Sequence, residues 1–175
     1  CGVDEVETPL LQPAAGINAQ LWLAEMRMGV DKLVAKENEP DSKHVFEVMQ
    51  SLSAPIDQAG LLNALQGRIT HLREWQLFLQ KHSILLCPIS GELPFDQQSD
   101  VESAERFKEI MRAQLTQLGL PALGLPGLAV ATGSAAGKPM GVQLIARRFR
   151  EDILISAGRD IESAFPAIQP IDPKP

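Results

Sequence analysis

The chain has 175 residues, 45% of them apolar, and a formal net charge of −6 with a pI near 5.1. This length and composition suit one domain with a real hydrophobic core. Its apolar runs are broken by Pro, Gly or charge, so none approaches the roughly 20 residues of a membrane span, and without a basic stripe we expect no direct binding to nucleic acid.

The beginning of the chain predicts two amphipathic helices. Residues 3–6 fit a short strand, and residues 12–18, which contain Pro and Gly, fit a loop. Residues 19–36 carry apolar side chains at helical spacing, which predicts one helix. The run 38–41 contains a proline and should end that helix, and Asp41 can cap the next one.

A long helix and a buried strand are expected next. Asp57 can cap a helix that extends to about His82. Its apolar stripe comprises Leu61, Leu65, Ile69, Leu72, Trp75 and Leu79. Residues 83–88 form an apolar run of strand length that ends in proline. Because this run shows no polar alternation, it predicts a strand that is buried on both faces, as in a parallel or mixed central sheet.

One more long helix is expected before the final strands. Ser99 and Glu102 fit a capping box, which would open a helix that extends to about Leu118. Gly119 is a natural residue for the end of that helix, and Pro121 follows it as a stop.

The last part of the chain predicts an extended segment, a turn, a strand and a helix. These are residues 120–132, 133–138, 139–146 and 150–164, respectively, and the last helix begins with acidic residues that suit the positive end of a helix dipole. The tail, residues 166–175, is rich in proline and should lie on the surface or be loose. Helices alternate with strands of the buried type, so the predicted fold class is α/β.

The residues themselves indicate no catalytic centre and no metal site. The three histidines, His44, His71 and His82, fall on predicted helices outside any metal-ligand spacing. The two cysteines, Cys1 and Cys87, make neither a disulfide framework nor a zinc site, and Cys87 is expected to be a buried small hydrophobe. So few cysteines, together with the acidic pI, favour a cytoplasmic protein.

The run 133–138 superficially suggests a phosphate-binding loop. Its glycine spacing is one residue short of that motif. The residue after Lys138 is Pro139, which supplies neither the magnesium-binding hydroxyl nor a backbone N–H. We therefore interpret the run as a hairpin turn.

Four segments occur in an order that is typical of one family. They are SILLCP at residues 83–88, LGLPALGLPG at 118–127, GKPMGVQLI at 137–145 and FREDIL at 149–154. These resemble, in turn, a strand ending in proline, the G-L-P-A segment, the G-x-P-x-G-V-Q strand and the start of the last helix of the amidase signature family. Residues 1–50 are compatible with this resemblance but not diagnostic of it.

The resemblance implies the C-terminal part of the amidase-signature fold, with a mixed central sheet flanked by helices and with residues 1–175 as one segment of a single amidase domain. Enzymes of this family hydrolyse amide C–N bonds with a serine nucleophile, a second serine in a cis peptide and a lysine base. No metal or organic cofactor is implied. The family places all three catalytic residues upstream of the matched segments, and nothing in this chain matches them. We therefore assign no catalytic residue to this chain, and we expect the chain alone to be inactive.

The resemblance also suggests which residues face the substrate. Open α/β sheets bind ligands beyond the carboxyl ends of their strands, which makes Ser90, Gln114 and Thr116 the candidates for a wall of the acyl pocket. Thr116 stands where the family often has Asn, and Ile89 stands where it usually has Thr. The substrate preference therefore stays open, and the three candidates could equally be polar groups that are satisfied locally.

Two other functions remain open. One is the glutaminase subunit of a tRNA-dependent amidotransferase, in which Glu109 would stand at the position of an aspartate that binds the amino group of glutamine. The other is a stand-alone, non-catalytic binding or structural domain.

The amidase interpretation predicts a small-molecule amide as partner, bound together with an N-terminal part, and neither nucleic acid nor a membrane. The chain opens at Cys1 with neither a start methionine nor a signal peptide, and it reads as a chain already in progress. In the family, upstream residues cover and flank the strands. We therefore expect the isolated chain to expose strand edges and apolar faces, and hence to self-associate.

Overall fold

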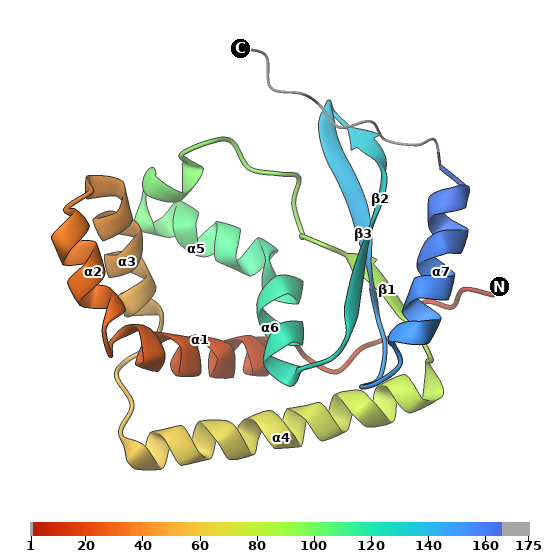
Figure 1. Cartoon of the computed structure of the whole chain (residues 1–175), viewed down its shortest axis with the longest axis horizontal. Helices are drawn as coiled ribbons and strands as arrows, with labels where there is room; N and C mark the ends of the chain where they lie inside the picture. Colours follow the sequence, from red (N-terminus) through yellow and green to blue (C-terminus); the bar gives the residue numbers. More distant parts are fainter. Residues whose placement is uncertain (1, 166–175) are drawn as a thin grey trace.

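The computed structural model describes residues 2–165 and has the predicted α/β class. Its elements in chain order are α1 (Gln12–Met26), α2 (Val30–Glu37), α3 (Pro40–Leu52), α4 (Gln58–Lys81), β1 (Leu85–Pro88), the 3₁₀ turn η1 (Ser99–Val101), α5 (Ala104–Ala113), α6 (Leu115–Leu123), β2 (Gly127–Ala135), β3 (Lys138–Ile145) and α7 (Glu151–Ser163). The helices α1, α2, α3, α5 and α6 gather on one side of the sheet, and α7 lies on the other (Figure 1). The long helix α4 runs along the bottom of this view, beneath both groups. The proline-rich tail, residues 166–175, lies outside the described residues.

The first helices differ from the prediction. The predicted loop at 12–18 is the beginning of α1, because Pro13 stands in the first turn, where a missing N–H and a fixed φ suit a helix. The predicted single helix over 19–36 is also wrong, since α1 ends at Met26 and α2 begins at Val30. The expected strand at 3–6 is absent from the described structure, where these residues form no ladder with the sheet.

The cap of α3 is a different residue from the one predicted. Asn38 ends α2 in the left-handed region with φ 58°. Glu39, not Asp41, caps α3, and its carboxylate accepts hydrogen bonds from the backbone N–H groups of Asp41 and Ser42 at 3.1 and 2.6 Å. Pro40 takes the first helical position, so the residue before it becomes the cap.

The long helix α4 begins as predicted and is only partly buried. Asp57 caps it by accepting a hydrogen bond from the N–H of Gly60 at 2.8 Å, and His82 ends it. Trp75 and Leu79, near its C-terminal end, are fully buried. The predicted stripe is wrong for the N-terminal half, where large apolar side chains are exposed: Leu61, Leu62, Leu65 and Ile69.

The three strands form one antiparallel sheet in the order β1-β3-β2. The expected hairpin joins β2 to β3, and its two turn residues, Ala136 and Gly137, have φ of 52° and 76°, which is the conformation of a type I′ turn. The expected burial of β1 on both faces is wrong, because β1 is an edge strand of the described sheet and Leu86 is 50% exposed.

The predicted helix from Ser99 to Leu118 is instead a short 3₁₀ turn and two helices. Ser99 donates a hydrogen bond to the Glu102 carboxylate at 3.3 Å, but the cap of α5 is Ser103, whose hydroxyl accepts from a backbone N–H. Gly119 and Pro121 do not end the second helix, which continues to a left-handed cap at Gly124. Gly119 instead allows close packing, since an added Cβ would lie 3.0 Å from the side chain of Leu11, the residue just before α1.

The core has one cluster on each face of the sheet. The first joins α1, α4 and α6 to the sheet through Ala14, Trp75, Leu79, Leu120, Leu123, Leu125 and Ile145. The second joins α7 to the other face through Val130, Leu144, Ala146 and Leu154. The helix α7 begins with Glu151 and Asp152 as predicted. None of the described helices is long and apolar enough to cross a membrane.

Candidate functional site

The loop after β1 is tied to the break between α5 and α6. Thr116 Oγ1 donates a hydrogen bond to the carbonyl oxygen of Ile89 at 2.6 Å, and the side-chain amide of Gln117 donates to the same oxygen at 3.3 Å. The N–H of Gly91 and the hydroxyl of Ser90 donate to the carbonyl of Ala113 at 2.6 and 3.4 Å. The structure therefore places two of the predicted substrate-binding residues, Ser90 and Thr116, at the contact between the loop after β1 and the α5–α6 break.

Gln114 is the residue at which the helix breaks. It has φ −91° and ψ 21°, and it is at once the C-cap of α5 and the N-cap of α6. Its side chain lines a groove between α1 and the α5–α6 junction, whereas Ser90 and Thr116 do not line it. These two residues hold the junction on which Gln114 stands, through hydrogen bonds that satisfy them locally.

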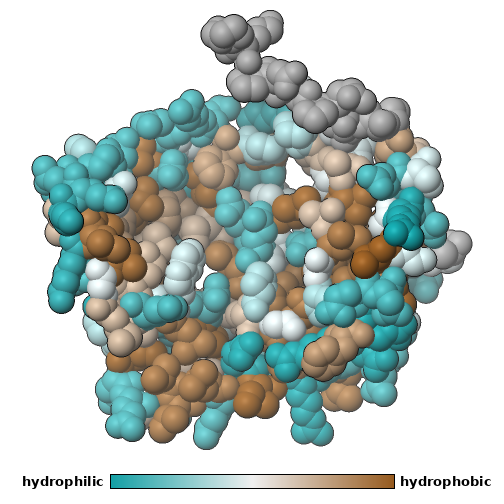
Figure 2. All heavy atoms as spheres, in the orientation of Figure 1, coloured by the Kyte–Doolittle hydropathy of each residue, from teal (hydrophilic) through white to brown (hydrophobic). Residues whose placement is uncertain are grey.

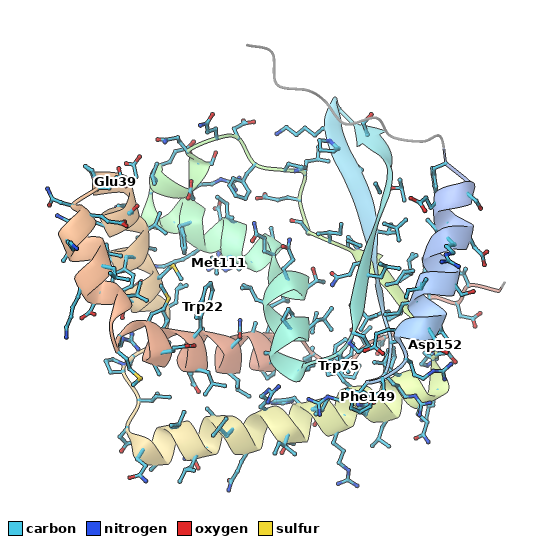
Figure 3. The ribbon with its side chains drawn as sticks, viewed as in Figure 1. Trp22, Glu39, Trp75, Met111, Phe149 and Asp152 are labelled. Carbon is cyan, nitrogen blue, oxygen red and sulfur yellow. The ribbon has the colours of Figure 1, made fainter. Side chains whose placement is uncertain are left out.

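The groove has a volume of about 520 Å³ and mixes polar and apolar side chains. Its lining residues are Asn18, Leu21, Trp22, Glu25, Gln114, Gln117 and Leu118. Trp22 is 45% exposed, and both it and Met111 of α5 point into the space between α1 and α5 (Figure 3). The space-filling view shows hydrophobic residues in a hollow of the surface over this region (Figure 2).

Of the residues that line this groove, the sequence analysis singled out Gln114 alone, and the largest side chain that it missed is Trp22. Helical spacing grouped it with the apolar side chains of a core-facing stripe. A usable signal was present, because Asn18 and Glu25 lie four residues before and three residues after it, on the same helix face. A tryptophan between polar neighbours on one face indicates a rim rather than a core position.

Ion pairs fix the rest of the loop after β1. Arg106 of α5 pairs with Glu92 of the loop at 3.2 Å and with Glu109 at 3.4 Å. The hydrogen bond to Glu92 raises the pKa of Arg106 above its usual value. Lys138 donates to the carbonyl of Pro94 at 2.5 Å and pairs with Asp96 at 3.1 Å. Lys138 thus holds the loop.

The residues that could carry other chemistry are dispersed. His44 lies on α3, His71 pairs with Glu74 on α4 at 3.0 Å, and His82 ends α4 beside Phe78. Within residues 2–165, no three His, Cys, Asp or Glu side chains come together in an arrangement that could hold a metal ion. Cys87 is half-buried against the first core cluster, and burial raises the pKa of its thiol, which disfavours the reactive thiolate.

No family model matches the chain. It is 29% identical over 162 residues to an indoleacetamide hydrolase of Bradyrhizobium diazoefficiens, covering 92% of this chain and 31% of that relative. It is 36% identical over 128 residues to an indoleacetamide hydrolase of Bradyrhizobium japonicum, covering 73% of this chain and 28% of that relative. The A subunit of the glutamyl-tRNA(Gln) amidotransferase of Desulforudis audaxviator is 32% identical over 108 residues, and the match covers 62% of this chain and 21% of that subunit. The chain thus spans about a third or less of these relatives.

Solved structures share the fold at lower identity. Kluyveromyces lactis allophanate hydrolase matches with a TM-score of 0.68 and 20% identity, over 91% of this chain and 26% of that one. The A subunit of the glutamyl-tRNA(Gln) amidotransferase of Thermotoga maritima matches with a TM-score of 0.66 and 19% identity, over 92% of this chain and 34% of that one. A crystal structure of an amidase matches with a TM-score of 0.66 and 20% identity, over 89% and 36%.

Proposed function

The chain belongs to the amidase signature family and corresponds to its C-terminal portion, and on this premise we propose that it is part of an enzyme that hydrolyses amide C–N bonds. In this proposal the serine nucleophile, the second serine and the lysine base lie in the portion of the enzyme that the chain does not match. Residues 1–175 then form one segment of a single amidase domain. They contribute scaffold and a wall of the acyl pocket.

The single observation that carries the proposed role is the groove beside the α5–α6 break. Gln114 lines it directly, and Thr116 and Ser90 tie its wall to the loop after β1. A concave site with a few polar groups on a largely preformed scaffold is the usual form of a small-molecule site. We assign Gln114 to substrate contact, and Ser90 and Thr116 to the support of that wall.

The second candidate is the glutaminase subunit of an amidotransferase, which several relatives favour because they are named as A subunits of glutamyl-tRNA(Gln) amidotransferases. Glu109 would then have to bind the amino group of glutamine. In the structure Glu109 is exposed on α5 and pairs with Arg106 at 3.4 Å. Glu109 does not line the groove, so we prefer the amidase.

The proposed partners follow from the same premise. The substrate is a small-molecule amide, bound together with the rest of the enzyme, without nucleic acid or membrane. The exposed apolar side chains on the first half of α4, such as Leu62 and Ile69, support self-association of the isolated chain. We also place the protein in the cytoplasm, because the chain has only two cysteines.

The test joins this chain to the missing portion. In what we call the fused enzyme, residues 1–175 replace the matching segment of the Bradyrhizobium diazoefficiens indoleacetamide hydrolase. We expect the fused enzyme to release ammonia from primary amides, and the isolated chain to release none above background. A folded but inactive fused enzyme would contradict the proposal. So would hydrolysis by the isolated chain that is lost on Ser90→Ala substitution.

A further inference from the structure

We propose that the groove between α1 and α6 binds an aromatic acyl group, with Trp22 as the stacking surface and Glu25 as the residue that favours the neutral amide over its carboxylate product. This inference rests on the proposed function and names its substrate class. It assigns a specificity role to α1.

Trp22 is placed unlike the other tryptophan of the chain. Trp75 is fully buried in the first core cluster, where it meets Phe78 edge-on with ring centroids 5.8 Å apart. Trp22 leaves 45% of its surface exposed and lines the groove together with Leu21 and Leu118. A flat aromatic group that stacks on an indole gains about 0.5–1.5 kcal/mol beyond the effect of its buried area. A saturated ring of similar size does not gain this term.

The polar lining of the groove matches a carboxamide. Asn18, Gln114 and Gln117 each carry a side-chain amide, which offers both a donor and an acceptor. The Gln117 side chain is already directed to the carbonyl of Ile89, so Asn18 and Gln114 are the amides available to a ligand. They stand on the two walls of the groove, Asn18 on α1 and Gln114 at the α5–α6 break.

Glu25 is the only charged residue among those that line the groove in the described part of the chain. It lies three residues after Trp22, on the same face of α1. Hydrolysis converts a neutral amide into a carboxylate, so the charge of Glu25 repels the product and not the substrate. The groove should therefore bind the amide more tightly than the corresponding acid.

The groove also lies away from the exposed apolar side of α4. In Figure 1, α1 separates α4 from the space between α1 and α5. Self-association through the first half of α4 would thus leave Trp22 accessible. Binding is therefore measured by equilibrium dialysis of the fused enzyme, in a form whose serine nucleophile is replaced by alanine so that the amide is not hydrolysed.

The ligands are phenylacetamide, cyclohexylacetamide and phenylacetate. We expect phenylacetamide to bind about two- to tenfold more tightly than cyclohexylacetamide, and more tightly than phenylacetate. Trp22→Ala should abolish the preference for the aromatic ring, and Trp22→Phe should retain most of it. Glu25→Gln should reduce the discrimination against phenylacetate and leave the aromatic preference unchanged. Far-UV circular dichroism, which reports the helix content, verifies that each variant is folded.

The matched control is Phe149→Ala, which removes an 87% exposed ring outside this groove and should change none of these affinities. Equal binding by the Trp22→Ala and unsubstituted chains would overturn the inference, as would an equal loss in Phe149→Ala. A second arm uses the active fused enzyme, where Trp22→Ala should raise KM for phenylacetamide more than KM for cyclohexylacetamide, because both rings lose buried area but only the aromatic ring loses the stacking. An active fused enzyme that lacks this KM effect would contradict the inference and leave the proposed function standing. A fused enzyme that binds phenylacetamide through Trp22 but does not hydrolyse it would contradict the proposed function and leave the inference standing.

Discussion

The hydroxyl of Thr116 donates a hydrogen bond to the carbonyl oxygen of Ile89 at 2.6 Å and so joins the first turn of α6 to the end of β1. The two residues are 27 positions apart in the chain. Their bond sets the position of the α5–α6 break, and Gln114 at that break lines the groove. A polar contact in the scaffold thereby shapes the wall to which we assign substrate contact.

Thr116→Val should remove this hydrogen bond without changing the shape of the side chain. We expect a loss of about 0.5–1.5 kcal/mol of stability, moderated because Gln117 also donates to the Ile89 carbonyl. The measurement is thermal unfolding of the fused enzyme, together with KM for an amide, which should rise. The control is Thr70→Val, whose hydroxyl bonds only within exposed α4 at 3.3 Å. Equal effects of the two substitutions would refute the role of Thr116.

Leu123→Ala should destabilise the protein more than the loss of the Thr116 hydroxyl. The side chain of Leu123 is fully buried in the first core cluster, between α6 and the sheet. Truncation of such a residue costs about 2–5 kcal/mol. Leu62→Ala, at a position that is 54% exposed on α4, should change stability by no more than about 0.5 kcal/mol. Thermal midpoints of the two fused-enzyme variants measure the difference, and similar midpoints would contradict the described core.

Two glycine substitutions should act in opposite directions. At Gly141 in β3, an added Cβ would lie 2.7 Å from the backbone oxygen of Val130, so Gly141→Ala must distort the β2–β3 ladder and destabilise the protein. At Gly16, exposed inside α1, nothing lies within 4 Å of the added atom. Gly16→Ala should therefore stabilise by about 0.5–1 kcal/mol. The pair is compared by thermal unfolding, and the same sign for both would show that one of these environments is misassigned.

The cap of α3 predicts a specific dependence on pH. Hydrogen bonds from the backbone N–H groups of Ser42 and Asp41 lower the pKa of Glu39 below its ordinary 4.5. A depressed carboxyl pKa contributes stability that is present above 4.5 and is lost as the pH falls through the folded-state value. Glu39→Ala should therefore lower the thermal midpoint at neutral pH, and this difference should shrink as the pH falls below 4.5.

The control for this prediction is Glu37→Ala, which removes an exposed carboxylate in the last turn of the neighbouring helix α2. Its effect should not follow the same course with pH. A Glu39→Ala difference that stays constant from neutral pH to well below 4.5 would show that the carboxylate does not hold the cap.

Local side-chain chemistry made part of this fold predictable. Asp57 caps α4 because its carboxylate reaches the N–H of Gly60, a contact confined to one turn. The two turn residues of the hairpin, Ala136 and Gly137, lie within the turn predicted at 133–138, and both have positive φ. The start of α7 likewise follows from Glu151 and Asp152. Each of these signals lies within a few residues of the feature that it determines.

The features that sequence patterns do not predict depend on residues far apart in the chain. In the sequence Gly119 is typical of a helix end, but α6 continues through it, and the glycine instead makes room for Leu11, 108 positions earlier in the chain. Of the predicted site residues, Gln114 lines the groove, while the local hydrogen bonds of Ser90 and Thr116 could not be foreseen from spacing. Trp22 was missed because periodicity marks an apolar side chain without showing whether a neighbouring helix covers it.

If residues 1–175 are one portion of an amidase fold and not a self-contained unit, the isolated chain should not behave as a monomeric domain. Sedimentation equilibrium of the isolated chain, combined with urea unfolding, tests this most directly. We predict species heavier than the 19.1 kDa monomer and a broad unfolding transition, because strand edges and the apolar side of α4 are open to other molecules. A 19.1 kDa monomer that unfolds in one cooperative step would contradict this and would favour a stand-alone binding domain.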